Sequence, residues 1–308
     1  MLRWVTVLAA LLAPGTAAAH SGAWIGPNEL PFAWTLDPWV VGPLALAWWL
    51  YGRGLARLWG RAGTGRGVAV WRAGCFAAGM VTLVLALVWP LDALGGTLFA
   101  AHMAQHMALL VVAPPLLLLG RPLAATAAGL PRSWRGPVAA GLRWTPLRAA
   151  CGWLVRPVPA LAVNALVLWC WHAPAAFNAA VADDLIHAAE HAAFLVAGFA
   201  FWWAVLHPAR ADPMAPVAIA LAALVTLIHS GLLGALIALS PVPLYDVYAG
   251  RGAAWGMTQL EDQAMAGLIM WIPAGFGYLG AGLWLLGRWL SGLDGTKNGP
   301  ARGPTAAG

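Results

Sequence analysis

Two histidines lie four residues apart within one apolar stretch of the chain, His102 and His106 in TLFAAHMAQHMALLVVAPPLLLLG (97–120). At helical period their imidazoles lie one turn apart on the same helix face, with Met103 and Met107 beside them. The stretch is long enough to cross a bilayer, and titratable side chains inside a membrane usually face the interior of a helix bundle. The spacing therefore indicates a metal or cofactor site; hydrogen bonding between helices is the structural alternative.

A second pair has the same spacing, His187 and His191, with Glu190 between them. Two such pairs on separate helices provide what a metal site between helices needs, because imidazoles can project inward from facing elements. Imidazole and thioether ligands suit copper, and Met103 and Met107 would add soft donors for Cu(I). Bis-histidine coordination of a haem iron is equally available from these residues, so haem is the alternative cofactor.

Three other histidines are candidate ligands on the same predicted outer side of the membrane. His172 follows Cys170 and Trp171 at a predicted membrane boundary, where an interfacial role is the alternative. His229 lies within a deeply apolar run and is an additional candidate. His20 would become the first residue after signal cleavage, and its α-amine and imidazole could chelate a metal unless it belongs to a mobile tail.

A polar triplet precedes the last apolar run: Glu261, Asp262 and Gln263. Carboxylates are favoured at a helix N-terminus by the helix dipole, and this is the structural explanation for the two acidic residues. In the functional interpretation, the triplet orients the metal-binding histidines without itself binding the metal, as we also expect of Glu190. Alternatively, the triplet receives a metal ion from outside the membrane.

The composition identifies the class of protein. Hydrophobic residues make up 61% of the 308 residues and charged residues only 9%, and the mean hydropathy is +0.75. Together these values exclude an ordinary soluble domain and indicate an integral membrane protein. The three cysteines form no C-x-x-C pair, so no disulfide framework is expected. We find no nucleic-acid motif, and no nucleophile with a base at a plausible spacing, so an enzyme is not expected.

The predicted fold is all-α, a polytopic seven-transmembrane-helix bundle. Residues 1–19 resemble a signal peptide, residues 20–37 form a periplasmic N-terminal segment, 38–290 the seven-helix transmembrane domain, and 291–308 a disordered cytoplasmic tail. The predicted spans are 39–55, 73–91, 97–119, 158–172, 185–206, 214–239 and 264–287. A Pro/Arg-rich inner connection, 120–157, is expected at the membrane surface.

The basic residues predict the orientation of the bundle. With the mature N-terminus outside and the C-terminus inside, 15 of the 17 lysines and arginines fall in inner segments. Of the other two, Arg3 belongs to the signal peptide and Arg251 to an outer loop. Because inner loops are rich in Lys and Arg, the chain is expected to be N-out and C-in. The formal net charge of +6 therefore reflects topology.

Five ordered blocks resemble a known family. They are HMAQHMALLVVAPPLLLLGRP (102–122), WCWHAP (169–174), LIHAAEHAAF (185–194), PLYDVY (243–248) and EDQAMAGLIMWIP (261–273). Together they resemble the CtaG family of cytochrome c oxidase assembly factors, the type associated with caa-type oxidases, from about residue 35 to 288. The resemblance implies that His102, His106, His172, His187 and His191 occupy the family's histidine positions and that 261–263 form its acidic block.

The resemblance implies a multi-pass protein of the bacterial plasma (inner) membrane that helps to mature a haem-copper oxidase of the respiratory chain. We expect a metallochaperone that binds copper at a periplasm-facing His/Met site and assists its insertion into the oxidase catalytic subunit. Periplasmic copper chaperones are further expected partners, and the lipid bilayer surrounds the bundle. The alternatives are a membrane copper transporter, a haem-binding membrane protein and an assembly scaffold without a metal.

Overall fold

The structure is a computed structural model that describes residues 24–208 and 214–297, with side chains to Ser291. The predicted signal peptide (1–19) and His20 lie outside the described residues. Within the described part no strand occurs, which confirms the all-α prediction. The elements are η1 (Leu30–Phe32), α2 (Pro38–Ala62), α3 (Val70–Leu87), α4 (Leu91–Gly95), α5 (Phe99–Met107), the π-helical η2 (Ala108–Val112), α6 (Ala113–Leu119), α7 (Pro122–Gly129), α8 (Arg132–Arg143), α9 (Thr145–Leu154), α10 (Pro157–Trp171), α11 (Pro174–Ala182), α12 (Asp184–Leu206), α13 (Ala215–Ala238), η3 (Asp246–Tyr248), η4 (Arg251–Trp255) and α14 (Gln259–Lys297).

Within the part of the chain that the structure describes, five helical segments are long and apolar enough to cross a membrane, namely Val70–Gly95, Phe99–Leu119, Asp184–Leu206, Ala215–Ala238 and Gln259–Ser291. The bent pair α9–α10, which turns by 80°, would be a sixth span if it is counted as one. The five segments correspond to predicted spans two, three, five, six and seven, and the bent pair corresponds to predicted span four. The predicted first span corresponds to α2, a helix of 25 residues that is not among the five. The chain is thus a membrane protein, and the count of seven spans stays a prediction.

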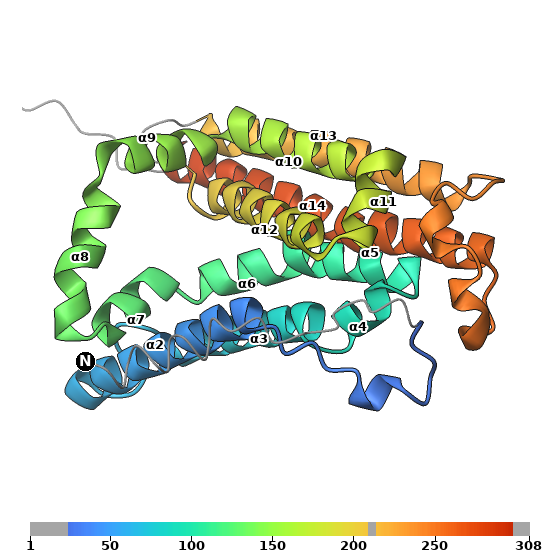
Figure 1. The fold of residues 1–308 in the computed structure, drawn as a ribbon. Helices are drawn as coiled ribbons and strands as arrows, with labels where there is room; N and C mark the ends of the chain where they lie inside the picture. Colours follow the sequence, from blue (N-terminus) through green and yellow to red (C-terminus); the bar gives the residue numbers. More distant parts are fainter. Residues whose placement is uncertain (1–23, 209–213, 298–308) are drawn as a thin grey trace, which may run out of the picture.

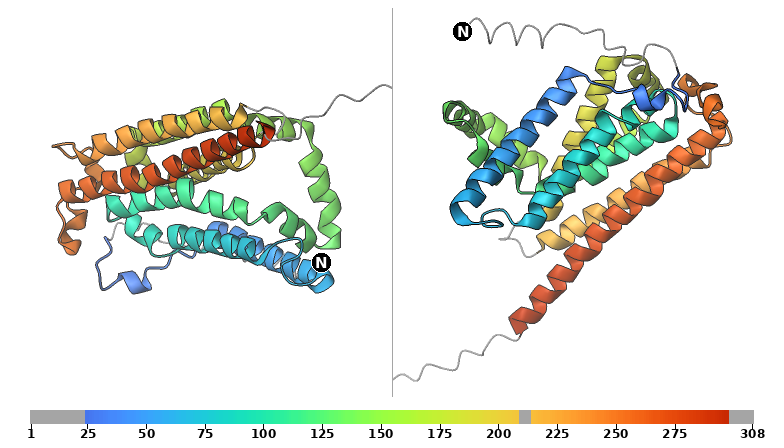
Figure 2. Two further views of the ribbon diagram at one scale, coloured as in Figure 1. Left: turned by 180° about the vertical axis from the view of Figure 1, so that it is seen from behind. Right: turned by 90° about the horizontal axis from the view of Figure 1, so that it is seen from below.

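The long helices run roughly along one axis, so the molecule has two distinct ends (Figure 1). At one end lie α4, α11 and the start of α5; at the other lie the C-terminal end of α2, α7 and α8. Helix α8 crosses the direction of the long helices and joins α7 to α9, as the further views agree (Figure 2). The connection 120–157, which we predicted to be an inner one, consists mainly of the helices α7, α8 and α9, and α8 contains no buried residue.

Small residues allow helices to approach closely at two crossings. A Cβ on Gly267 of α14 would lie 2.5 Å from the Gly234 carbonyl oxygen of α13. A Cβ on Gly54 of α2 would lie 1.9 Å from the Ala125 carbonyl oxygen of α7. Side chains at these two positions would push the backbones apart, as expected for packing between membrane helices.

The predicted third span is one continuous run of three elements, α5, η2 and α6. The π-helical turn ends at Val112, two residues before Pro114 and Pro115, which lack the N–H groups that an α-helix would donate to Leu110 and Val111. The Leu110 carbonyl instead accepts a hydrogen bond from Trp202 Nε1 of α12 at 3.1 Å. This contact joins η2, which follows the histidine pair of α5, to α12, which carries the other pair.

Helix α14 continues to Lys297, past the boundary predicted at residue 290. The last residues of the predicted tail, 298–308, lie outside the described part of the chain.

Candidate metal centre

Helix α12 presents three polar side chains in its first two turns. Asp183 caps this helix by accepting hydrogen bonds from the backbone N–H groups of Leu185 and Ile186, both at 2.9 Å. His187, Glu190 and His191 follow at spacings that place them on one face. All three are buried, and Glu190 has no exposed surface.

Helix α5 presents His102 and His106, and two contacts to other helices fix its position. Asp262 of α14 accepts hydrogen bonds from the N–H groups of Phe99 and Ala100, at 2.7 and 2.9 Å. These N–H groups belong to the first turn of α5, which has no side-chain cap of its own. Gln105, which directly precedes His106, donates from Nε2 to Asp92 Oδ1 at 2.9 Å and to the Ala86 carbonyl oxygen at 2.8 Å.

The two helices bring His102, His187, Glu190 and His191 together in what we call the four-residue cluster. One ligand atom from each residue lies within 4.8 Å of the others. A tetrahedral ion with bonds of about 2.0–2.2 Å holds its ligands about 3.4 Å apart, so small side-chain rotations would close the cluster around an ion. The structure thus brings the two predicted pairs to one place.

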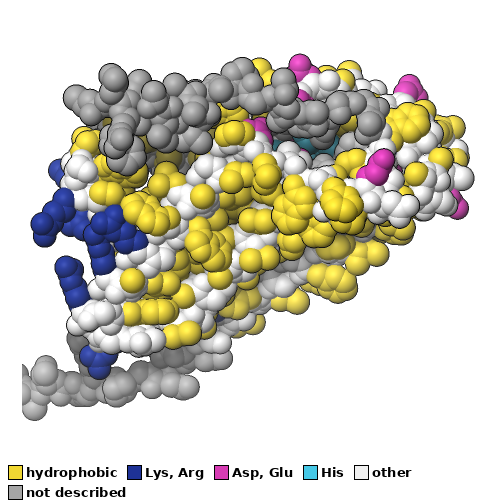
Figure 3. All heavy atoms as spheres, turned by 60° about the horizontal axis from the view of Figure 1, so that its bottom comes forward, with side chains coloured by type: hydrophobic (Ala, Val, Ile, Leu, Met, Phe, Trp, Pro, Cys, Tyr) yellow, Lys and Arg dark blue, Asp and Glu magenta, His cyan; other side chains and the backbone are white. Residues whose placement is uncertain are grey.

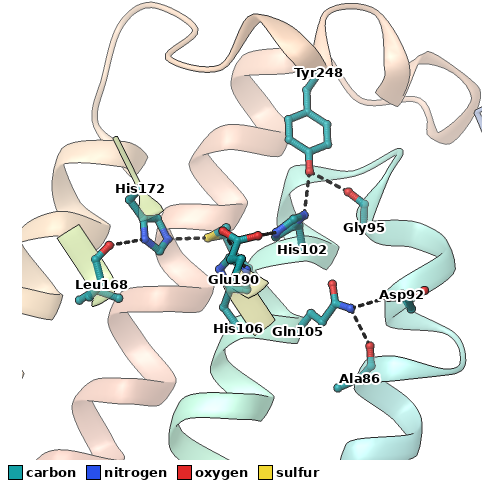
Figure 4. A network of polar contacts seen from close by, with 11 residues as sticks. Ala86, Asp92, Gly95, His102, Gln105, His106, Leu168, His172, Glu190 and Tyr248 are labelled. Atoms are coloured by element: carbon teal, nitrogen blue, oxygen red, sulfur yellow. Dashed lines mark hydrogen bonds and ion pairs between the residues drawn. The ribbon is translucent and has the colours of Figure 1, made fainter. Parts of the chain in front are cut away.

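Glu190 contacts both histidines of α5. Its Oε2 lies 3.3 Å from His102 Nε2 and its Oε1 lies 3.5 Å from His106 Nε2 (Figure 4). We predicted that Glu190 would orient the histidines without binding the metal, whereas the structure places its carboxylate among the histidine side chains. Burying a carboxylate is unfavourable unless a positive charge compensates it. A bound cation or a protonated imidazole would supply that charge.

Tyr248 determines which nitrogen of His102 faces the cluster. Its hydroxyl donates to the Gly95 carbonyl oxygen at 2.7 Å and lies 3.2 Å from His102 Nδ1. The hydroxyl has only one hydrogen, so the contact with His102 requires Nδ1–H to donate to the tyrosine oxygen. In neutral His102 the lone pair is then on Nε2, which faces Glu190. This is the arrangement of a metal-binding histidine whose other nitrogen is held by the protein.

His172, the residue that ends α10, has the same arrangement. Its Nδ1 lies 2.7 Å from the Leu168 carbonyl oxygen, which can only accept, so Nδ1 carries the hydrogen. Its Nε2 lies 3.3 Å from Met103 Sδ, which is also only an acceptor. In neutral His172, the lone pair of Nε2 and a lone pair of the Met103 sulfur therefore face each other, and both residues are buried. We call Met103 and His172 the soft pair, because thioether and imidazole suit Cu(I).

His106 lies between the four-residue cluster and the soft pair. The centre of its ring is 5.8 Å from that of His191 and 5.6 Å from that of His172. It is fully buried, and neither ring nitrogen has a hydrogen-bond partner among the residues that the structure describes. Its Nε2 lies 3.5 Å from Glu190 Oε1, too far for a good hydrogen bond. A buried imidazole without a hydrogen bond is unfavourable, so its presence here calls for a ligand or a proton.

The segment with the two tyrosines lies over the histidines. Tyr245 donates from its hydroxyl to the His172 carbonyl oxygen at 2.8 Å, and Tyr248 points toward His102 (Figure 4). Burial raises the pKa of both tyrosines above the ordinary value, so both hydroxyls stay protonated as donors. Gln263 of α14 secures the segment, since its side chain accepts from Leu244 N at 2.7 Å and donates to the Val242 carbonyl oxygen at 3.1 Å.

The other predicted residues lie elsewhere or make no polar contact with the histidines. Glu261 is exposed and accepts from the backbone N–H and the hydroxyl of Thr258, both at 2.8 Å, so it caps its own helix. Met107 is buried in the apolar core. His229 is half-buried in α13, and neither ring nitrogen has a hydrogen-bond partner in the described part of the chain.

Sequence reasoning did not assign roles to Tyr245, Tyr248, Gln105 and Asp92. The two tyrosines belong to the block PLYDVY, and Gln105 lies between the two histidines of α5. Their positions in these blocks were the available signal. Their hydrogen bonds, however, join residues far apart in the chain, and spacing does not reveal such pairs.

Comparison with known proteins gives one match. The model of the family described as cytochrome c oxidase caa3 assembly factor matches residues 49–291, most of the chain. No curated protein and no solved structure matches. The family model spans all the helices that supply the histidines.

Proposed function

We propose, since the chain belongs to the cytochrome c oxidase caa3 assembly factor family, that it binds copper at the four-residue cluster and passes the ion to the catalytic subunit of a haem-copper oxidase. The observation that carries this proposal is the group of four buried ligand atoms within 4.8 Å of one another. In this proposal copper is the cargo of the protein, and no substrate is turned over. Periplasmic copper chaperones would be its donors.

The donor set favours copper. Imidazoles dominate the cluster, and the soft pair adds a thioether beside an imidazole whose Nε2 is free in the neutral form. Such ligands suit copper, and thioether favours the Cu(I) state.

His106, which lies between the four-residue cluster and the soft pair, would allow an ion to move from one to the other by ligand exchange.

The packing around the histidines favours an ion over a haem. The Phe177 ring lies 4.9 Å from the His102 ring, and the Phe194 ring lies 4.2 Å from the His106 ring. A macrocycle between two axial histidines would require both phenylalanines to move. A bare ion requires only small rotations of the ligands.

The proposed orientation places the histidines at the periplasmic face of the plasma membrane, with seven spans that include α2 and α10. On the face drawn in Figure 3, Lys and Arg side chains gather at one end of the molecule and Asp and Glu toward the other. His102 and His106 lie in α5, which starts at the end of the molecule opposite α8, and basic residues favour the inner side. The ion would then leave toward the outer side, beneath the segment of Tyr245 and Tyr248.

The test is the metal content of the full-length protein in detergent, with its visible spectrum, after loading with Cu(I). The variants are His187→Ala/His191→Ala and, as a matched control, His207→Ala, which changes an exposed histidine at the far end of α12. We expect copper in the wild type and the control, and its loss from a double variant that stays folded. A haem absorption band would favour the haem alternative, and no copper in any of these proteins would favour the scaffold.

The transfer step needs a second test, in cells that lack the native copy of this gene. Wild-type protein should restore the copper content of the caa3 oxidase, and the double variant should not. Restoration by the double variant would contradict copper delivery through this cluster.

A further inference from the structure

A pocket at the opposite end of the molecule is lined almost entirely by arginines. Its volume is about 410 Å³, and its lining consists of Arg53, Arg57, Arg61, Pro131, Arg132 and Arg135. The three from α2 are spaced four residues apart, so they share one helix face. The other two belong to the first turn of α8. Five guanidinium groups from two helices thus face one hollow, which we call the arginine pocket.

These charges are not neutralised by carboxylates of the described chain. Within residues 24–208 and 214–291, none of the five arginines forms an ion pair with a carboxylate; the ion pairs found there join His102 and His106 to Glu190. Like charges gathered in one place repel each other, so the arrangement is unfavourable without an anion. The arginine pocket therefore offers a binding place for a negatively charged ligand.

Two of the arginines are held in place by the backbone. Arg57 Nη1 donates to the carbonyl oxygens of Ala128 and Gly129 at the end of α7, at 2.7 and 3.2 Å. Arg135 Nε donates to the Leu130 carbonyl oxygen at 3.3 Å. These bonds fix two of the guanidinium groups that line the pocket, whereas Arg61 and Arg132 are exposed.

The start of α8 adds to the positive potential. Pro131, which lines the pocket, is the N-cap residue of this helix, and no side chain caps it. A helix N-terminus carries a partial positive charge and free N–H groups, which favour phosphate. Guanidinium groups bind phosphate oxygens in a bidentate manner. Five arginines beside a free helix start therefore favour a phosphate group over a simple carboxylate.

The surroundings of α8 indicate that the phosphate belongs to a lipid. This helix crosses the direction of the long helices at one end of the molecule (Figures 1 and 2), and it contributes Arg132 and Arg135 to the pocket there. Large apolar side chains near it are exposed: Trp134 is 44% exposed, Leu142 61% and Trp144 63%. Exposed Trp and Leu beside arginines are typical of a helix that lies in the headgroup region. A phosphate met at this depth is attached to acyl chains.

We propose that the arginine pocket binds the phosphate headgroup of an anionic phospholipid and thereby anchors α8 in the inner membrane interface. The guanidinium groups and the start of α8 would hold the phosphate, while the apolar side chains of α8 lie among the acyl chains. The site is separate from the histidines, so it does not depend on copper binding.

The test uses the full-length protein in detergent and native mass spectrometry with added dioleoylphosphatidylglycerol or dioleoylphosphatidylcholine. The variant is Arg61→Gln/Arg132→Gln, which removes one exposed arginine from each helix. The control is Arg143→Gln/Arg148→Gln, which removes the same charge from α8 and α9 outside the pocket. We expect the wild type and the control to retain phosphatidylglycerol preferentially, and the pocket variant to bind it at least about 10-fold less tightly.

Three results would overturn the proposal: equal weakening in the control variant, no weakening in the pocket variant, or displacement of phosphatidylglycerol by millimolar inorganic phosphate. The first result would show that the overall positive potential of this end, and not the pocket, attracts the lipid. The last result would show that the pocket is a site for free phosphate. Gel filtration and circular dichroism check folding. In addition, Arg61→Lys/Arg132→Lys keeps the positive charge but loses the bidentate guanidinium geometry, so its affinity for phosphatidylglycerol should lie between those of the wild type and the Gln variant.

Discussion

Both ends of this bundle gather titratable side chains, five imidazoles beside one carboxylate at one end and five guanidiniums at the other. The histidine end is buried: His102 is 1% exposed, and His106 and Glu190 are not exposed at all. At the arginine end, Arg53 and Arg57 are half-buried and Arg61, Arg132 and Arg135 are exposed. Burial removes water as an alternative partner, so each donor and acceptor at the histidine end depends on protein or ligand. At the arginine end water and ions can replace any single contact.

The comparison teaches where substitutions matter. At the histidine end, one side chain often fixes another: Tyr248 fixes His102, and Asp262 fixes the start of α5. Such contacts specify one geometry, and their loss leaves buried groups unsatisfied. At the arginine end the charges act together and are screened by salt. Single substitutions should therefore have large effects at the first end and small effects at the second.

The largest effect is expected for Glu190→Gln. The change keeps the shape of the side chain but removes the only carboxylate of the cluster, so copper affinity should fall more than about 100-fold, beyond the range for residues that only orient a ligand. Competition with a Cu(I) chelator measures it. Glu261→Gln, which changes the exposed carboxylate at the start of the 261–263 block, serves as the control. Equal affinities for the two variants would contradict a ligand role for Glu190.

The next effect in size is expected for Tyr248→Phe. This variant keeps the ring but loses the hydroxyl that accepts from His102 Nδ1, so copper affinity should fall about 10- to 100-fold. Tyr245→Phe is the matched control, because that hydroxyl bonds the backbone of His172 and no imidazole nitrogen. The same chelator competition applies. A larger loss in the control would show that the tyrosine segment acts through its overall packing.

A moderate effect on stability is expected for Asp262→Asn. The amide can replace only one of the two hydrogen bonds to the first turn of α5, so the free energy of unfolding should fall by about 1 kcal/mol, as for a lost helix cap. Chemical or thermal unfolding in detergent measures it. Asp246→Asn changes an exposed carboxylate and should leave stability unchanged. An unchanged Asp262→Asn protein would mean that α5 is held by its other contacts.

The smallest effect is expected for Arg61→Gln, at the arginine end. Its guanidinium is exposed among like charges, so removing it should change the free energy of unfolding by less than about 0.5 kcal/mol, in the stabilising direction. The gain should disappear at high salt, because salt screens the repulsion. Unfolding at low and high salt tests both points. If the free energy of unfolding fell by more than about 1 kcal/mol, single contacts would matter as much at this end as at the histidine end.

The sequence was sufficient for the features that depend on local spacing and composition. Apolar runs predicted membrane helices, and five of the seven predicted spans lie in helices of the required length and hydropathy. The four-residue spacing predicted that His102 and His106 share a face, as do His187 and His191. Ordered blocks indicated the family that the match over residues 49–291 shows. Hydrophobicity and helical period are properties of a short segment, so they can be read without the rest of the chain.

Only the tertiary structure decided which faces meet. Glu261, Asp262 and Gln263 are neighbours in sequence, yet successive residues of a helix point about 100° apart. The first therefore caps its own helix, the second caps α5, and the third holds the segment before Tyr245. Likewise, the meeting of Met103 with His172 depends on how α5 and α10 pack. Helical period fixes the face of each residue, whereas the neighbour of that face is set by the packing of all the helices together.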